Sequence, residues 1–144
     1  MANWYGETRT NYFKVTDEAR YQELFQRLVG EEEIEDFSSE FGGELYHAFG
    51  SYCDICFIGV DEDGKPDYNI ELEYFDFLKE ISKILTKDSC LVLTCVGHEK
   101  LRYLTGICSV VFPNGKITEM SLDGFAISKV QRYFGKDYDL RLDY

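Results

Sequence analysis

Proline, histidine and long apolar runs are scarce in this chain of 144 residues. The scarcity of proline and of apolar runs argues against a linker between domains and against a membrane-spanning helix. With two prolines and no stretch rich in glycine and serine, the sequence gives no sign of a linker between domains. The longest run without a charged residue is far shorter than the roughly 20 residues that a membrane-spanning helix needs. The N-terminus has neither a basic segment nor an apolar one, so we do not expect it to be a secretory signal.

Basic side chains are almost missing from residues 17–80, which carry 19 Asp and Glu against 4 Lys and Arg. The formal net charge of the whole chain is −12, so the excess negative charge lies entirely in this stretch. An acidic chain is a poor ligand for nucleic acid and for an anionic membrane surface. We therefore expect an acidic surface that either keeps the protein soluble or docks a basic protein, with no direct binding of nucleic acid or membrane.

The five cysteines are odd in number and follow no export signal, which predicts reduced thiols in the cytoplasm. Cys53 and Cys56 form a C-x-x-C pair, but the surrounding pattern predicts a strand, where an offset of three residues puts side chains on opposite faces. We interpret both as core cysteines and expect no metal and no disulfide. Neither phosphate-loop nor dinucleotide-binding spacing occurs, so we expect no cofactor.

The apolar pattern predicts a single α+β domain with a mainly antiparallel sheet and about three helices, in the order β-α-β-β-α-β-β-β-α. Hydrophobic residues make up 44% of the chain, which is enough for a sizeable core. Gly50-Ser51 and Asn114-Gly115 between apolar runs predict hairpin turns. We expect helices over residues 17–29, 69–85 and 123–134, strands over 11–15, 44–49, 52–60, 90–96, 101–112 and 116–122, and a possible short helix within 31–41.

Eight carboxylates in the acidic stretch are the candidates for a partner-binding face. We expect two helices and the segment between them to hold these carboxylates at fixed spacing, where an array of negative charges can resemble nucleic-acid phosphates. An alternative surface consists of Trp4, Tyr5 and Arg9, which we expect in a loop. The eight candidates are Glu31, Glu32, Glu33, Glu35, Asp36, Glu71, Glu73 and Asp76.

The opening residues 3–6 (N-W-Y-G) and 9–13 (R-T-N-Y-F), followed by an acidic α+β body, carry a resemblance. The chain resembles small proteins of unassigned role carried by phages and mobile elements of Gram-positive bacteria. In size and charge it is also similar to DNA-mimicking anti-restriction and anti-CRISPR proteins. This resemblance implies that the protein inhibits a bacterial defence system in the cytoplasm of the host, but it assigns no functional residues.

Three functions fit these features. The first is a non-enzymatic inhibitor that offers its acidic face to a basic nucleic-acid-binding protein, such as a restriction or CRISPR nuclease. The second is an immunity protein that neutralises a basic toxin. The third is a small enzyme that uses His47 or His98 with a cysteine or a carboxylate, although no catalytic signature surrounds either histidine. The sequence leaves the oligomeric state open.

Overall fold

A computed structural model describes residues 5–99 and 103–140, so Trp4 of the alternative surface lies outside the described residues. The main sheet has six antiparallel strands in the order β11-β10-β9-β1-β6-β3. Two smaller antiparallel sheets, β2-β7-β8 and β4-β5, complete the strands of the described part. The α+β class and the mainly antiparallel sheet are therefore confirmed.

The bounds of the elements are as follows. The main sheet contains β1 (Tyr5–Thr10), β3 (Glu35–Asp36), β6 (Phe49–Ser51), β9 (Leu91–Glu99), β10 (Tyr103–Val111) and β11 (Ile117–Ser121). The smaller sheets contain β2 (Leu28–Val29), β7 (Cys56–Val60), β8 (Pro66–Leu72), β4 (Ser39–Phe41) and β5 (Glu44–Tyr46). The helices are α1 (Glu18–Phe25), α2 (Tyr74–Ser82) and α3 (Leu122–Phe134).

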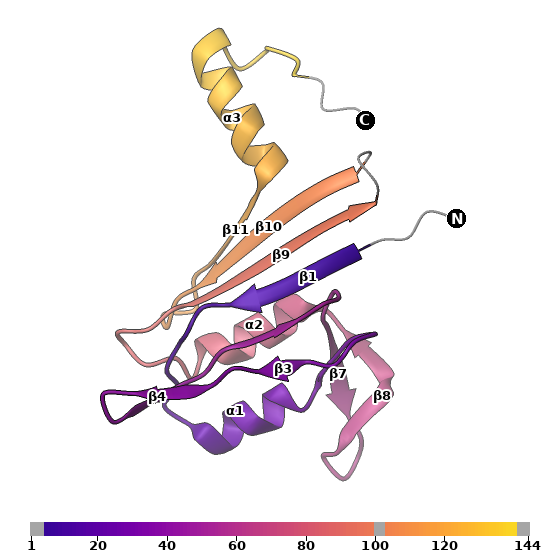
Figure 1. Ribbon diagram of the computed structural model, residues 1–144, viewed down its shortest axis with the longest axis vertical. Helices are drawn as coiled ribbons and strands as arrows, with labels where there is room; N and C mark the ends of the chain where they lie inside the picture. The colour runs from indigo at the N-terminus through magenta and orange to yellow at the C-terminus, as the bar shows by residue number, and fades with distance from the viewer. Residues whose placement is uncertain (1–4, 100–102, 141–144) are drawn as a thin grey trace.

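Helices α1 and α2 lie on the same side of the main sheet (Figure 1). The Asp17 carboxylate accepts a hydrogen bond from the Arg20 backbone N–H, which caps the start of α1. A capping box between Glu73 and Asp76 starts α2. Each helix then buries one apolar stripe against the sheet because its inward residues recur at helical spacing.

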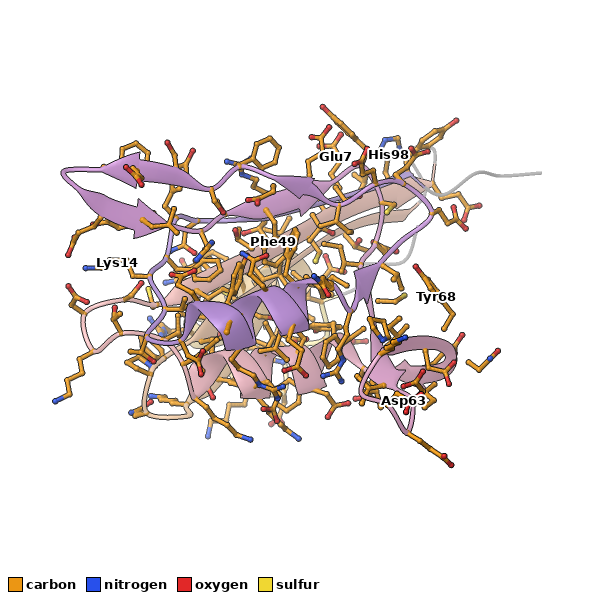
Figure 2. The ribbon with its side chains drawn as sticks, turned by 90° about the horizontal axis from the view of Figure 1, so that it is seen from below. Glu7, Lys14, Phe49, Asp63, Tyr68 and His98 are labelled. Atoms are coloured by element: carbon orange, nitrogen blue, oxygen red, sulfur yellow. The ribbon has the colours of Figure 1, made fainter. Side chains whose placement is uncertain are left out.

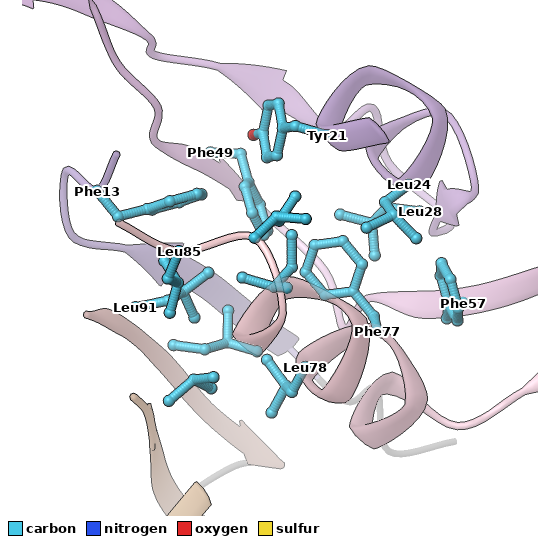
Figure 3. Packing of buried hydrophobic residues seen from close by; sticks show 14 residues of the cluster. Phe13, Tyr21, Leu24, Leu28, Phe49, Phe57, Phe77, Leu78, Leu85 and Leu91 are labelled. Carbon is cyan, nitrogen blue, oxygen red and sulfur yellow. The ribbon is translucent and has the colours of Figure 1, made fainter. Parts of the chain in front are cut away.

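Aromatic rings connect the layers of the core (Figure 3). Phe77 on α2 contacts Phe49 of the main sheet and Phe57 of β7 edge to face, with ring centroids 5.9 and 5.5 Å apart. Phe13 packs edge to face on Tyr21 of α1, 5.7 Å away. The main sheet, both helices and the small sheet therefore share one hydrophobic core.

The predicted turn at Gly50-Ser51 is wrong, because both residues lie in β6 inside the main sheet. Gly50 is needed for close packing: a Cβ there would lie 2.8 Å from the Thr8 carbonyl oxygen. The hairpin turn is instead at Gly42 and Gly43, which join β4 to β5 with φ values of 60° and 82°. This hairpin also replaces the short helix considered for residues 31–41.

Further expectations at the chain's start and middle differ from the structure. The helix expected over residues 17–29 ends at Phe25, and Leu28–Val29 form β2. The strand expected over residues 52–60 begins only at Cys56. The N-terminal strand is β1 rather than residues 11–15, which make only isolated bridges at Phe13 and Val15. The helix expected over residues 69–85 begins only at Tyr74, since Pro66–Leu72 pairs with β7 as β8. The turn at Asn114-Gly115 and the strands that flank it are confirmed.

Gly59 on β7 leaves no room for a side chain, because a Cβ there would lie 2.9 Å from the Cβ of Ile70. We expect Gly59→Ala to lower the free energy of unfolding by about 1–3 kcal/mol through overpacking. Urea denaturation measures this change, and Asn69→Ala on the exposed side of β8 is the matched control, with an expected effect below about 0.5 kcal/mol. Equal stability of the parent and Gly59→Ala would show that Ile70 of β8 does not pack closely against Gly59.

Candidate functional site

A broad hollow of about 970 Å³ opens between the start of β1, the turn after β2, and the strands β7 and β8. Within residues 5–99 and 103–140, four carboxylates and three tyrosines line it, and no lysine or arginine does. We call it the acid–tyrosine hollow. Its carboxylates are Glu31, Glu32, Asp54 and Glu71, and its tyrosines are Tyr5, Tyr52 and Tyr68.

Cys53 holds two walls of the hollow together. The backbone N–H of Glu32 donates to the buried Cys53 Sγ at 3.4 Å, and the Thr8 hydroxyl donates to the Cys53 carbonyl at 3.0 Å. A Cβ at Gly30 would lie 2.5 Å from Cys53 Sγ, so only glycine permits this approach. These contacts fix the turn that carries Glu31 and Glu32 beside the bend that carries Asp54.

The tyrosines project from three separate elements. Tyr5 begins β1, Tyr52 lies in the bend after β6, and Tyr68 lies on β8; their exposed fractions run from 59% to 75%. The Tyr5 ring stacks on His98, with centroids 5.4 Å apart. Figure 2 shows Tyr68 and His98 at the end of the molecule opposite Lys14. This end therefore offers aromatic faces, which attract cations, next to carboxylates.

The carboxylates of the hollow have no cationic partner within the part of the chain that the structure describes. None of the four forms an ion pair there. The acids that pair with a lysine or arginine lie elsewhere, at Glu23, Glu44, Glu80 and Asp88. Four like charges around one hollow repel one another, so a cationic ligand is favoured there.

The structure brings three of the eight predicted carboxylates, Glu31, Glu32 and Glu71, into the acid–tyrosine hollow. Glu71 lies on β8 rather than on a helix. Tyr5 from the alternative surface joins them, although it begins a strand rather than lying in a loop. The acidic and the aromatic candidates thus share one surface.

The other predicted carboxylates have different surroundings. Glu73 and Asp76 cap α2, and of the eight only Asp76 lies within a helix. Asp36 accepts a hydrogen bond from the backbone N–H of Ser38 at 2.8 Å. Glu33 is exposed just before β3.

A smaller hollow of about 270 Å³ adjoins the first and shares Tyr52 with it. Glu35 and Arg9 both line this second hollow. The Arg9 guanidinium lies 3.9 Å above the centre of the Phe37 ring, so this cation is already engaged with an aromatic face.

Sequence reasoning missed Asp54, Tyr52 and Tyr68. Asp54 belongs to the same acidic stretch, but it lies within the C-x-x-C pair and was interpreted as part of a strand. Tyr68 alternates with Ile70 and Leu72 at a spacing of two residues. That alternation is the signal that would have identified β8 and its outward tyrosine.

The two histidines lie outside all the hollows described here. His47 is buried: its Nε2 lies 2.7 Å from Glu18 Oε2 and its Nδ1 lies 3.1 Å from Ser38 Oγ. These contacts tie α1 to the start of the β4-β5 hairpin. His98 lies on β9, which extends beyond the strand expected over residues 90–96. An apolar cavity of about 390 Å³ between the main sheet and α2 also contains neither histidine.

The C-x-x-C pair lies at a bend rather than inside a strand, with Cys53 buried and Cys56 exposed at the start of β7. Burial raises the pKa of the Cys95 thiol. We expect iodoacetamide at pH 8 to modify Cys56 at least about 10-fold faster than Cys95, because the Cys56 thiol is exposed whereas the partly buried Cys95 thiol is less accessible and forms less thiolate. Peptide mass spectrometry over time measures both rates, and equal rates would contradict the partial burial of Cys95.

In the described ranges, no group of three or more histidine, cysteine or acidic side chains is arranged to hold a metal ion. The helices of those ranges are too short or too polar to cross a membrane. Comparison with known proteins found no matching family model, no matching curated protein and no matching solved structure. Fold and hollow together define an α+β protein with a negatively charged, aromatic-lined surface, and function is inferred from that surface.

Proposed function

We propose that this protein is a non-enzymatic binding protein whose acid–tyrosine hollow takes up a basic segment of another protein. The observation that supports this proposal most strongly is the lining itself, which joins four carboxylates and three exposed tyrosines and includes no lysine or arginine from the described part of the chain. A ligand that combines positive charge with a flat, weakly hydrated group satisfies both kinds of side chain.

Arginine is the side chain that fits this chemistry best. Its guanidinium stacks on aromatic faces and also donates paired hydrogen bonds to a carboxylate. Lysine offers a point charge with a stronger hydration shell, so it gains less from the tyrosines. We therefore infer an arginine-containing segment as the preferred ligand.

A basic nucleic-acid-binding protein, such as a restriction or CRISPR nuclease, is the partner class that we propose. Such proteins present arginine and lysine to phosphates, and an array of carboxylates competes for the same groups. The net charge of −12 on the whole chain adds long-range attraction to a basic partner and repels nucleic acid. On this proposal the protein acts in the cytoplasm of a bacterial host as an anti-defence inhibitor.

Pull-down from a bacterial lysate tests the partner class. The immobilised protein is expected to retain a basic protein at low salt and to release it as the Debye length falls from about 10 Å towards 3 Å. Added duplex DNA or RNA is expected to compete for the captured protein. Capture of a toxin that nucleic acid does not displace, together with protection of cells that express it, would instead identify an immunity protein.

A further inference from the structure

Helix α3 (Leu122–Phe134) extends away from the rest of the molecule, and none of its residues is buried (Figure 1). The helix nevertheless carries large apolar side chains. Phe125, Tyr133 and Phe134 are 50%, 82% and 60% exposed, and Leu122 is exposed as well. Leu122, Phe125 and Tyr133 follow spacings of three and eight, which places them along one stripe of the helix. Phe134, nine positions after Phe125, lies on the opposite side of the helix, where its ring stacks on Tyr138.

The neighbouring outer face of the main sheet is also apolar and uncovered. Val96, Leu104 and Met120 are all exposed on β9, β10 and β11. They lie on the face opposite to the buried Leu93 and Val111, which face the helices. We define the C-terminal apolar face as Val96, Leu104, Met120, Leu122, Phe125 and Tyr133.

The helix cannot turn back to cover its own sheet. Ser121 is both the last residue of β11 and the N-cap of α3, since its hydroxyl accepts a hydrogen bond from the Gly124 backbone N–H at 2.9 Å. No loop residue lies between strand and helix. Leu122 packs so closely against Gly106 of β10 that a Cβ there would lie 2.9 Å from Leu122 Cγ. The residues that the structure describes therefore leave this stripe uncovered.

The exposed apolar area is large for a monomer. With about 150–250 Å² per aromatic side chain, Phe125 and Tyr133 alone expose roughly 250 Å². Leu122 and the three sheet residues add to this area, which brings the face to about the 300–600 Å² of the largest apolar patch on an ordinary monomer. A standard interface buries about 800 Å² on each partner.

We propose that the C-terminal apolar face binds a second copy of this chain and forms a two-fold symmetric dimer. The face carries both a projecting helix and a flat sheet surface, so each copy can place its α3 against the sheet of the other. Residues 81–144 carry 7 Asp and Glu against 9 Lys and Arg, so this half of the chain adds little repulsion. Helices α3 and α1 lie at opposite ends of the long axis, which keeps the acidic stretches of two copies apart (Figure 1).

Sedimentation velocity of the full chain across a range of concentrations tests the dimer. The parent is expected to reach twice the chain mass of 16.8 kDa. The double variant Phe125→Glu and Tyr133→Glu is expected to raise the dimer dissociation constant at least about 100-fold, because it places charges in a desolvated apolar contact. Added sulfate is expected to strengthen the dimer, in contrast to the salt-sensitive binding proposed for the acid–tyrosine hollow.

Leu45→Glu on the β4-β5 hairpin is the matched control, since it puts a charge on another exposed apolar residue and should leave the dimer intact. Circular dichroism checks that each variant keeps its fold, as expected for exposed positions. A parent that stays monomeric at millimolar concentration overturns the proposal. So does a folded double variant that dimerises as well as the parent, because the interface would then lie elsewhere.

Discussion

Replacing Phe77 by alanine is expected to lower the free energy of unfolding by about 3–5 kcal/mol. Phe77 is 1% exposed and fills the space between Phe49 of the main sheet and Phe57 of the small sheet. Its removal leaves a cavity at the junction of the two sheets with α2 (Figure 3). Since a domain of this size is stable by about 5–15 kcal/mol, this one change removes a large share of the total.

Urea denaturation followed by circular dichroism measures the loss. Phe41→Ala is the matched control, because the same ring is removed from a position that is 49% exposed on the β4-β5 hairpin. We expect the control to cost less than half as much as Phe77→Ala. A loss below about 1 kcal/mol for Phe77→Ala would contradict a core that joins the two sheets through this ring.

Neutralising the four carboxylates of the acid–tyrosine hollow is expected to weaken binding of an arginine-rich peptide at low salt by about 100-fold. The variant combines Glu31→Gln, Glu32→Gln, Asp54→Asn and Glu71→Gln. A single exposed ion pair contributes about 0–1 kcal/mol, so the effect arises from four charges that act on one ligand. Isothermal titration calorimetry at two ionic strengths measures it, and the difference between the proteins is expected to shrink at high salt.

A second variant with the same net charge separates the hollow from the general negative field. Glu40→Gln, Glu62→Gln, Asp63→Asn and Asp137→Asn remove four exposed carboxylates that do not line the hollow. At physiological salt, distant charges are screened. Under that condition, we expect the control substitutions to weaken peptide binding by no more than about a tenth as much as the hollow substitutions do. Equal losses for both variants would mean that only net charge attracts the peptide.

Local signals explain which parts of the fold the sequence predicted. Asn114-Gly115 lies in a tight turn whose backbone needs a positive φ, and Gly115 has φ 86°. Helix α3 ends at Gly135, the glycine that the sequence indicated as its stop. Both features depend on a few neighbouring residues, so they are visible without knowledge of the tertiary structure.

The failures share a tertiary cause. Gly50 was interpreted as a turn residue, yet it is glycine because the backbone of β1 passes close to it. Residues 69–72 show helical spacing with the residues that follow, but pairing with β7 holds them as part of β8. In both cases, backbone pairing between strands overrides local propensity. The paired residues of β1 and β6 are more than 40 positions apart, whereas β7 and β8 pair across the short connection formed by residues 61–65.

The candidate site was visible in part. The acidic stretch pointed to Glu31, Glu32 and Glu71, but the expected helices do not carry them. The hollow exists because the turn at Gly30 packs against Cys53, a contact between residues 23 positions apart in the chain. Such a contact leaves no periodic signal, so the sequence indicated the charge of the site and Tyr5 but not Tyr52 and Tyr68.

The most direct test of the central claim is a map of where a basic segment binds. Amide chemical shifts of the isotope-labelled protein are recorded during titration with an unlabelled arginine-rich peptide at low salt. We predict that the largest changes fall on residues 30–32, 52–54 and 68–72, and that they disappear in the variant with the four hollow carboxylates neutralised. Changes centred on another surface, such as the β4-β5 hairpin, or no change at all, would contradict a binding site in the acid–tyrosine hollow.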